Sequence, residues 1–329
     1  MRLAQKLAKR SPAPPMRSHN ASPAMILVGG ENLIDFIESP DGTFTANLGG
    51  GPFNITKALA RQGQAVGYLT PISSDQMGDR LAADLEADGA TLLAPRSGSP
   101  TSLALVTLIN GQPSYQFYRQ KTAERQVSTT MLNRIIPKQA KAIQLGSLAL
   151  TSGKDADAWA QIYRAAHQRG LFTSLDPNIR PSFIKNRRKF LARLEWILAK
   201  TDLLKLSDED LDWLDPKRPA SEAAQHLRTE YNIPLVVLTR GAEGATGFTA
   251  HGQFDVSAPK AEPFMDAVGA GDTFMGTLLA QLSNAGMLKR SALETADEAR
   301  LTPILATAAK AAAMNCETSG CNPPYSADL

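Results

Sequence analysis

From residue 142 onward, the chain repeats one pattern that few folds can accommodate. Short apolar runs lie at residues 142–146, 171–175, 203–206 and 235–239, and longer segments separate them. Each run is apolar at nearly every position instead of at alternate ones, which is typical of parallel strands covered by helices on both faces. With a similar run at 25–30, the pattern predicts a doubly wound, three-layer α/β fold with a mostly parallel sheet.

Two predicted hairpins interrupt this alternation early in the chain. A Pro-Asp-Gly turn lies within the β-prone residues of about 36–48, and an Asn-Gly pair at 110–111 divides those of about 101–120. Asn-Gly between β-prone runs is a strong signal for a tight antiparallel turn. The hairpins therefore predict a second, smaller sheet.

Composition narrows the class of protein further. The 329 residues are enough for one large α/β domain or two small ones, and the aromatic content of 6% predicts an aliphatic core. The formal charge of +3 gives no sign of a nucleic-acid partner, and no apolar run reaches the length of a membrane span. We therefore expect neither nucleic acid nor a membrane as partner.

The first 24 residues differ from the rest of the chain. They contain five basic residues, several prolines and no acid, and they lack the apolar stretch of a secretory signal. We expect residues 1–24 to be a disordered basic extension and residues 25–329 to form the domain; a targeting peptide or an upstream start codon is the alternative. Cys316 and Cys321 are too few for a disulfide framework, so we expect reduced thiols and a cytoplasmic protein.

The strongest sign of chemistry is a group of three small residues followed by an acid: Gly269, Ala270, Gly271 and Asp272. From Phe274 onward, apolar residues recur at helical spacing, so this group lies where a helix begins. Free N–H groups and the positive end of the helix dipole bind phosphate or an anionic transition state at such a place. A carboxylate repels phosphate but can accept the proton of an attacking hydroxyl. The alternative is an acid that only complements the dipole.

A second glycine-rich turn, Gly49–Gly51, precedes the first predicted helix. Pro52 suits the first turn of that helix, and Asn54 can donate to and accept from hydroxyl groups. The alternative is a plain turn in which Asn54 caps the helix locally. The chain has no G-x-x-x-x-G-K-[ST] loop, and no G-x-G-x-x-G opens this helix, so the sequence predicts neither a P-loop kinase nor a dinucleotide-binding enzyme.

Together, the two glycine-rich segments resemble the two signatures of the ribokinase-like (PfkB) carbohydrate kinases. The first signature has a Gly-Gly pair followed by Asn, and the second reads Asp-Thr-x-Gly-Ala-Gly-Asp, with Ala267 here in place of Thr. The resemblance covers residues 25–324 and implies the ribokinase-like fold, in which a small β-sheet lid accompanies the α/β domain. It also implies that Asp272 is the catalytic base and that the amides of Gly269–Gly271 form an anion hole.

The runs 30–36, 176–181 and 315–324 look most like bacterial fructokinases. This resemblance implies sugar binding by five residues: Asp35, Gly50, Gly51, Asn54 and Arg180. It implies nucleotide binding by six others: Ser207, Thr239, Gly241, Gly244, Asn315 and Gly320. For each residue the alternative is structural, such as a strand-end acid, a turn or a helix cap.

Two kinds of cation are implied by the same resemblance. Magnesium would be held near the phosphates, through water, by Asp176, Asn178 and Asp210. A monovalent cation, K⁺, would lie near Asp266. Asp210 stands where the family usually has Glu, which is one methylene longer.

We therefore predict an ATP-dependent sugar kinase, with fructose as the expected substrate and fructose 6-phosphate as the product. Asp272 would take the proton with the ordinary aspartate pKa of about 3.9. The alternatives are a 2-keto-3-deoxygluconate kinase, another sugar or nucleoside kinase, and a sugar or nucleotide sensor without catalysis. The expected partners are the sugar and ATP, and the resemblance implies a homodimer that forms through the lid.

Overall fold

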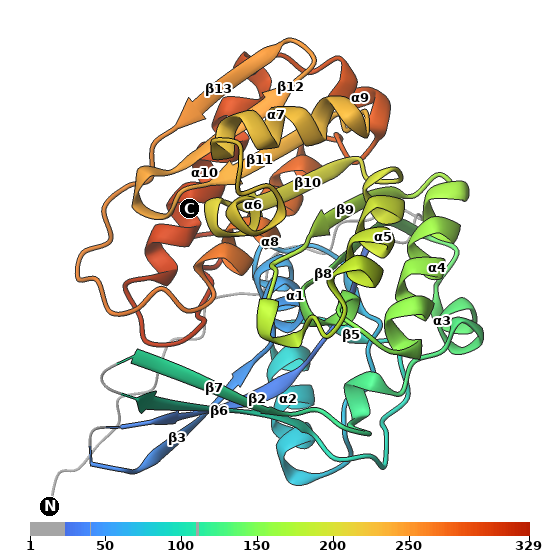
Figure 1. Cartoon of the computed structure of the whole chain (residues 1–329), viewed down its shortest axis with the longest axis vertical. Helices are drawn as coiled ribbons and strands as arrows, with labels where there is room; N and C mark the ends of the chain where they lie inside the picture. Colours follow the sequence, from blue (N-terminus) through green and yellow to red (C-terminus); the bar gives the residue numbers. More distant parts are fainter. Residues whose placement is uncertain (1–23, 40, 110–111) are drawn as a thin grey trace, which may run out of the picture.

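The computed structural model describes residues 24–39, 41–109 and 112–329. A large α/β body carries a small sheet that projects from one end (Figure 1). Residues 1–23 of the predicted extension and the Asn-Gly turn at 110–111 lie outside the described residues.

The body is built on one sheet, which has nine strands within the described residues. In spatial order they are β13 (Gly252–Val256), β12 (Ala245–Thr249), β11 (Leu235–Thr239), β10 (Leu203–Ser207), β9 (Phe172–Asp176), β8 (Ala140–Gly146), β1 (Met25–Gly29), β4 (Val66–Tyr68) and β5 (Thr91–Leu92). Neighbours from β11 to β5 are parallel, whereas β12 and β13 pair antiparallel at one edge. The mostly parallel sheet is thus confirmed.

Helices cover both faces of this sheet, which confirms the three layers. One face carries α1 (Gly51–Arg61), α2 (Gln76–Ala87), α8 (Ala270–Asn284), α9 (Arg290–Glu294) and α10 (Glu298–Asn315). The other face carries α3 (Thr129–Ile135), α4 (Lys154–Gln168), α5 (Arg187–Leu198), α6 (Asp208–Leu214) and α7 (Ala220–Glu230). Ile26 and Val28 of β1 belong to the core on the first face and Leu27 to the core on the second, which is why such a strand is apolar at every position.

The strand order places a crevice between β1 and β8. From β1 the chain continues to β4 and β5 on one side, and later to β8, β9, β10 and β11 on the other. In open α/β sheets, ligands bind at the carboxyl ends of the strands where the chain changes direction in this way. Gly146 and Asp176, which pair in register at the ends of β8 and β9, therefore mark the expected site.

The small sheet, which we call the lid, contains both predicted hairpins. Its order is β3 (Phe44–Gly49), β2 (Leu33–Glu38), β6 (Ser102–Ile109) and β7 (Gln112–Tyr118), with β2 and β6 parallel at its centre. β2 begins earlier than the predicted start at 36, because Leu33 packs against Ala104 and Leu148. Asp35 therefore belongs to the lid and not to the segment that directly follows β1.

The alanine-rich run 302–315 predicts the last helix, but α10 begins earlier, at Glu298. Asp297 caps this helix, since its Oδ1 accepts a hydrogen bond of 3.0 Å from the N–H of Arg300. Pro303 consequently lies inside the helix instead of near its start. Within the described ranges, no helix is both long and apolar enough to cross a membrane.

Candidate active site

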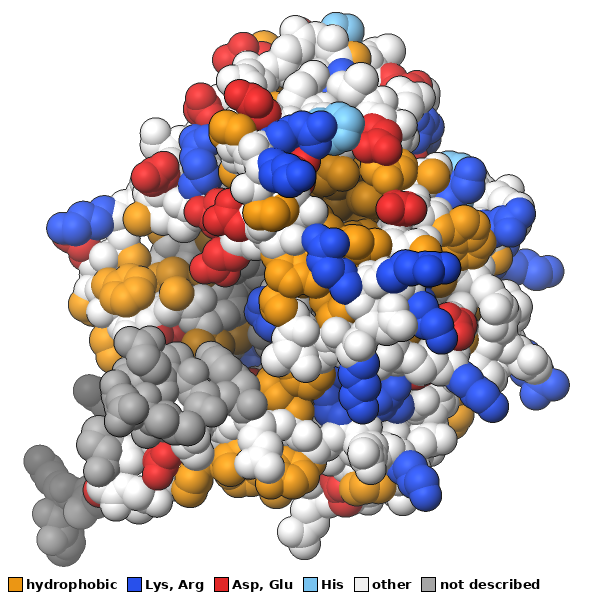
Figure 2. Space-filling model, in the orientation of Figure 1, with side chains coloured by type: hydrophobic (Ala, Val, Ile, Leu, Met, Phe, Trp, Pro, Cys, Tyr) orange, Lys and Arg blue, Asp and Glu red, His pale blue; other side chains and the backbone are white. Residues whose placement is uncertain are grey.

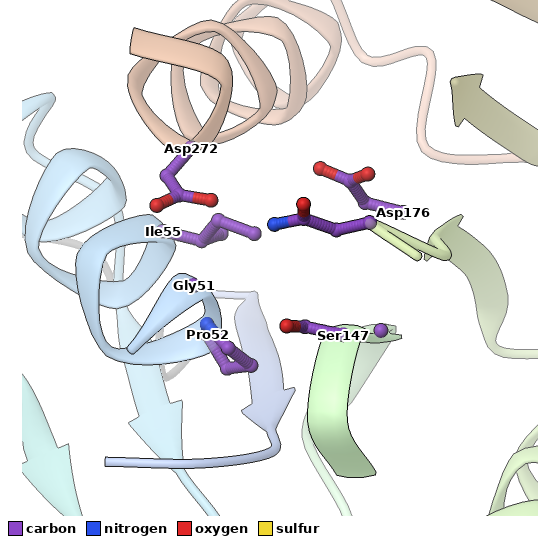
Figure 3. Close-up of a pocket in the computed structure, with 8 residues that line it drawn as sticks. Gly51, Pro52, Ile55, Ser147, Asp176 and Asp272 are labelled. Atoms are coloured by element: carbon purple, nitrogen blue, oxygen red, sulfur yellow. The ribbon is translucent and has the colours of Figure 1, made fainter. Parts of the chain in front are cut away.

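A pocket opens at the crevice between β1 and β8 (Figure 3). Its lining comes from the first turns of α1 and α8 and from the segments that end β8 and β9: Gly51, Pro52, Ile55, Gly146, Ser147, Asp176, Asn178 and Asp272. Two helix N-termini thus face two strand ends. Four of the residues expected to bind a ligand or to catalyse are in this lining.

Asp272 lies in the first turn of α8 and faces α1 across the pocket (Figure 3). Its Oδ2 accepts a hydrogen bond of 2.8 Å from Nδ2 of Asn54. A Cβ atom added at Gly51 would lie 3.2 Å from Oδ1 of Asp272 and 3.3 Å from Nδ2 of Asn178, so these two side chains converge on one glycine. The missing side chain leaves the space through which a hydroxyl group can reach Asp272.

The pKa of Asp272 is higher than the sequence led us to expect. Burial raises it, while the hydrogen bond from Asn54 and the charges of Lys205 and Arg180 lower it. The expected ordinary value is therefore wrong, since no sequence pattern reveals how deeply a first-turn carboxylate is buried. A higher pKa makes the carboxylate a stronger base, and the three opposing groups favour its ionised form.

The start of α8 has the free amides that anion binding requires. Gly269 precedes the helix in the left-handed conformation, with a φ of 75°. The N–H of Thr273 donates to Gly269, whereas the N–H groups of Gly271 and Asp272 have no acceptor in the described part of the chain. Outside its own helix, a Cβ added at Gly271 would meet no atom closer than Nζ of Lys205, at 3.5 Å. The free amides thus lie at a helix end where Gly271 leaves open space, with the ammonium group of Lys205 nearby.

Lys205 was not among the predicted site residues. It is buried in β10, and its Nζ pairs with Oδ2 of Asp176 at 2.9 Å. Burial alone would lower the pKa of Lys205, but Asp176, Asp210 and Asp272 outweigh burial and raise it, so the ammonium group stays charged. The sequence signal was a lysine inside an apolar strand, because a charge buried in a core strand requires a partner.

Asp176 ends β9 and forms the other half of this ion pair. Burial raises its pKa to about 6, and Lys205 partly offsets that effect. Among the residues that the structure describes, Oδ1 of Asp176 is buried without a hydrogen-bond partner, as are Oε2 of Glu31 and Oδ1 of Asn54. All three atoms are acceptors, on residues that line the pocket or contact its lining. The hydroxyl groups of a sugar would satisfy the acceptors of Glu31 and Asn54, and either a donor or a cation would satisfy that of Asp176.

The other predicted sugar-binding residues surround this pocket. Asp35 comes from the lid, and burial together with the charge of Asp272 raises its pKa to about 6. Gly50 caps α1 with a φ of 111°, and a Cβ there would meet the backbone oxygen of Glu31 at 2.6 Å. Arg180 follows β9, is exposed, and lowers the pKa of Asp272, which places a cation near that carboxylate.

Most residues expected to bind the nucleotide lie along the next strand ends. Ser207 and Thr239 pair in register at the ends of β10 and β11. Gly241 and Gly244 lie in the turn after β11, with φ values of 51° and 99°. These residues continue the row of strand ends that begins with β8 and β9, but none of them lines the pocket itself. ATP binding along this row stays a prediction.

Asp210, which was expected to hold magnesium through water, binds backbone amides. Its Oδ1 accepts from the N–H of Ile179 at 2.6 Å and its Oδ2 from the N–H of Ser207 at 3.0 Å, and Ser207 accepts from Asp210 in return as the cap of α6. Asp210 is also only 4% exposed. Backbone amides thus bind both carboxylate oxygens, so Asp210 positions the segment after β9, and it is not among the residues that line the pocket. A magnesium contact of Asp210 stays a prediction.

Asn315 and Asp266 hold loops together. Asn315 is fully buried, its Nδ2 donates to the oxygen of Val268 at 2.8 Å, and its Oδ1 accepts two further hydrogen bonds. The expected contact of Asn315 with a nucleotide is therefore replaced by internal bonds. Asp266 accepts from the N–H groups of Val268 and Gly320, both at 2.8 Å. These contacts join the loop before α8 to the segment after α10 and so support the anion site.

Comparison with known proteins gives matches over nearly the whole chain. The model of the pfkB family carbohydrate kinase matches residues 24–328. A fructokinase of Rhizobium leguminosarum bv. trifolii is 36% identical over 286 residues, which cover 84% of this chain and 85% of that protein.

Solved structures agree with this match. A fructokinase with bound ATP from Xylella fastidiosa has a TM-score of 0.83 at 28% identity and covers 91% of this chain and 94% of its own. A double mutant of a Vibrio cholerae fructokinase, bound to fructose, ADP and a potassium ion, has a TM-score of 0.79 and covers 92% of this chain and 95% of its own. At 23% identity, the second match shows the fold alone.

Proposed function

The chain belongs to the pfkB family of carbohydrate kinases, and we propose that it transfers the γ-phosphoryl group of ATP to the primary hydroxyl of fructose, which gives fructose 6-phosphate. The observation that carries this proposal is the placement of Asp272. It is hydrogen bonded to Asn54, lies at the N-terminus of α8, and faces the open space at Gly51. The similar proteins named fructokinase support the choice of sugar.

In this proposal, Asp272 accepts the proton of the sugar hydroxyl during in-line transfer. The buried acceptors of Asn54 and Glu31 and the carboxylate of Asp35 orient the other hydroxyl groups. The free amides at the start of α8 and the ammonium group of Lys205 stabilise the charge on the phosphoryl group. The transition state is loose, so the proton leaves late and a carboxylate of raised pKa is a sufficient base. The lid would exclude water, which otherwise competes as the acceptor.

Magnesium fits this site as an ion held mainly by phosphates. No group of three or more His, Cys, Asp or Glu side chains in the described ranges could hold a metal ion by itself. Mg²⁺ usually binds through one or two carboxylates, substrate phosphates and water. We propose the unpartnered Oδ1 of Asp176 as the carboxylate ligand, directly or through water, with Asn178 beside it. When bound, the ion neutralises phosphate charge.

A potassium site near Asp266 is a separate proposal. Asp266 joins the loop before α8 to the segment after α10, and each of its oxygens accepts one N–H and retains capacity for a cation.

We also propose that the lid mediates a homodimer in the cytoplasm, where ATP is available. Strand register places Phe36, Phe44 and Leu105 on the lid face opposite Asp35, and Phe44 is 44% exposed. An exposed apolar side chain such as Phe44 on a sheet face favours association with a second copy. Light scattering distinguishes a dimer from a monomer of 35.3 kDa.

A coupled assay of ADP release tests the function, with fructose, ribose, glucose, 2-keto-3-deoxygluconate and adenosine as acceptors. We expect the highest kcat/KM for fructose. A higher value for another acceptor would replace the substrate but retain the kinase. Absence of ADP release from the folded protein with every acceptor would favour a sensor without catalysis.

A further inference from the structure

Helix α1 takes part in contacts with the candidate site at both of its ends. At its start, Asn54 donates to Asp272, which belongs to the anion site at residues 269–272. At its end, Arg61 contacts residues 320–326, which follow α10 and which we call the C-terminal segment. Arg61 is not among the residues that line the pocket, so it can act on the reaction only through other residues.

The side chain of Arg61 binds the C-terminal segment at several points. Its Nη1 donates to Oδ1 of Asn322 at 2.6 Å and to the backbone oxygen of Pro323 at 2.8 Å. The guanidinium group also lies 4.8 Å from the centre of the ring of Tyr325, and the oxygen of Arg61 accepts from the N–H of Ser326 at 3.1 Å. Hydrogen bonds from a charged donor are strong, and this side chain is only 11% exposed, so the segment is fixed to the end of α1.

Another nitrogen of the same guanidinium group belongs to a separate ion pair. Nε of Arg61 donates to Oδ2 of Asp88 at 2.8 Å, and Nζ of Lys57 lies 3.8 Å from the same oxygen. Asp88 is the C-cap residue of α2, so this pair joins α1 to α2 and includes no residue of the candidate site. Substitutions can therefore break either set of contacts and spare the other.

Asn322 extends the contact of Arg61 to the first turn of α8. The N–H of Asn322 donates to Oδ1 of Asn315 at 2.8 Å, and the same oxygen accepts from Oγ1 of Thr273 at 3.1 Å. Nδ2 of Asn315 donates to the oxygen of Val268 at 2.8 Å. Val268 directly precedes the anion site and Thr273 directly follows it. Successive residues thus link the end of α1 by hydrogen bonds to both sides of the anion site.

Packing brings the C-terminal segment against the anion site itself. A Cβ atom built at Gly269 would overlap the side chain of Cys321, so the two residues are in close contact. The N–H of Gly320 donates to Asp266 at 2.8 Å, and the N–H of Thr273 donates to the oxygen of Gly269 at 2.8 Å. The position of the C-terminal segment therefore determines how tightly the turn before α8 is held.

We propose that Arg61 is a positioning residue for phosphoryl transfer, an inference that rests on the proposed kinase function. Through Asn322, Arg61 holds the C-terminal segment against the start of α8 and keeps the free amides of the anion site aligned with the phosphoryl group. Donors that stabilise a transition state act well only when they are aligned beforehand, and a small misplacement lowers the rate steeply. Loss of the contact between Arg61 and Asn322 should therefore lower kcat and leave sugar binding intact.

The substitution Arg61→Lys tests this role, because lysine keeps a positive charge for Asp88 but lacks the planar group that binds two acceptors of the C-terminal segment at once. Nε2 of Gln62 still donates to the oxygen of Pro324, at 3.0 Å in the wild type, so the segment stays attached. We expect kcat to fall about tenfold or more, with KM for fructose within about threefold of wild type and a small decrease in melting temperature.

Asp88→Asn is the matched control on the other side of the guanidinium group. It removes the charge that faces Arg61 and Lys57, while asparagine still offers Oδ1 to the hydroxyl of Tyr325, which donates to Asp88 at 3.1 Å. This variant should lower the melting temperature and leave kcat unchanged. The opposite effects of the two variants separate positioning from a structural role of Arg61.

Asn322→Ala removes the acceptor of Arg61 at an exposed position, so it decides the question even if Arg61→Lys does not fold. We expect kcat to fall by the same factor as in Arg61→Lys. The double variant should be no slower than the slower single variant, because both substitutions break the same contact. Ser326→Ala is the control within the segment. The hydroxyl of Ser326 has no hydrogen bond among the described residues, so kcat should not change.

Three results would overturn the positioning role. The first is a kcat within about threefold of wild type in either single variant. The second is a double variant whose loss of kcat is the product of the two single losses, since Arg61 and Asn322 would then act independently. The third is a loss of kcat that follows the melting temperature equally in Arg61→Lys and Asp88→Asn. Wild-type protein that releases no ADP with any acceptor would instead overturn the proposed function.

Discussion

At the scale of single residues, the candidate site depends on charges that are buried but partnered. Asp272 is stabilised by Asn54, and Asp176 pairs with Lys205, each partner coming from a different element. Removing a buried ion from water is costly, and only a close partner offsets that cost. Loss of either partner should therefore affect stability or activity far more than loss of a surface charge.

Asp272→Asn keeps the shape of the side chain but cannot accept a proton. We expect kcat to fall about 10²–10⁴-fold, since this is the usual loss of a general base. ATP binding should survive, because a negative charge near the phosphates is removed. Steady-state kinetics with nucleotide titration checks both quantities.

Glu222→Gln is the control for this substitution, since Glu222 is an exposed acid in the first turn of α7 and can only complement the helix dipole. It should leave kcat unchanged. A folded Asp272→Asn protein with kcat within about threefold of wild type would exclude Asp272 as the base.

Lys205→Met should lower the free energy of unfolding by about 3–5 kcal/mol, because the carboxylate of Asp176 is left buried without its partner. Adding Asp176→Asn should restore much of that stability, since the unpaired charge is removed, but it should not restore kcat. Urea unfolding and kinetics on the single and double variants measure the two effects. An equal loss of stability in the single and the double variant would mean that the broken ion pair is not the cause of that loss.

At the scale of the elements, the N-terminus of α8 is held by the segments around it. Asp266 and Asn315 bond the loop before α8 to the segment after α10. Cys321 packs against Gly269 so closely that any side chain at position 269 would overlap it. Cys321 is therefore a packing residue at the start of α8. The helix end that offers free amides is thus fixed by a neighbouring segment and not by its own cap.

Pro303 lies inside α10, where a proline lowers the stability of the helix. It is exposed inside α10, where it cannot donate a backbone hydrogen bond. Pro303→Ala should therefore stabilise the protein by about 1–3 kcal/mol. Thermal unfolding measures the gain.

The control for this element is Pro219→Ala, since Pro219 stands at the N-cap of α7, outside the helix interior. No comparable gain is expected there. An unchanged or lower melting temperature of Pro303→Ala would show that the ring contributes more to packing than its missing donor costs.

At the scale of the whole molecule, the lid and the body enclose several acids between them. Glu31, Asp35 and Asp176 each have a pKa raised to about 6, with burial as the largest cause. Figure 2 shows one face of the molecule, over which acidic and basic side chains are both spread. The titration behaviour of the protein is instead expected to come from its interior.

Activity and stability should therefore respond to acid in opposite directions. kcat/KM for fructose should fall as the pH drops through about 6, because the carboxylates that accept hydrogen bonds become protonated. In the unfolded chain these acids titrate at lower pH, so the folded state binds more protons between the two values. Their contribution to stability is present at low pH and is lost as the pH rises through about 6.

Rate profiles and melting temperatures between about pH 5 and 8 check this expectation. Asp35→Asn should make kcat/KM fall less as the pH is lowered, since one of the titrating groups is removed. A melting temperature that falls together with activity below pH 6 would instead attribute the loss to unfolding.

The fold could be predicted because its signals are local. A strand covered on both faces must be apolar at every position, and the runs near β8, β9, β10 and β11 satisfy that rule. Asp272 could be found for the same kind of reason, since a helix start beside small residues is visible in a few consecutive letters. The raised pKa of Asp272 could not be predicted, because burial depends on Asn54 and the other groups that fold around it.

The sequence by itself determined which segments become strands and helices, where the anion-binding helix begins, and which carboxylate stands there. Only the tertiary structure decided the partners of each charge. Lys205 became notable when strands far apart in sequence placed it beside Asp176, whereas Asp210 and Asn315 proved to hold backbone and loop segments in place. The physical reason is that secondary structure follows from neighbours along the chain, while ionisation and hydrogen-bond partners depend on neighbours in space.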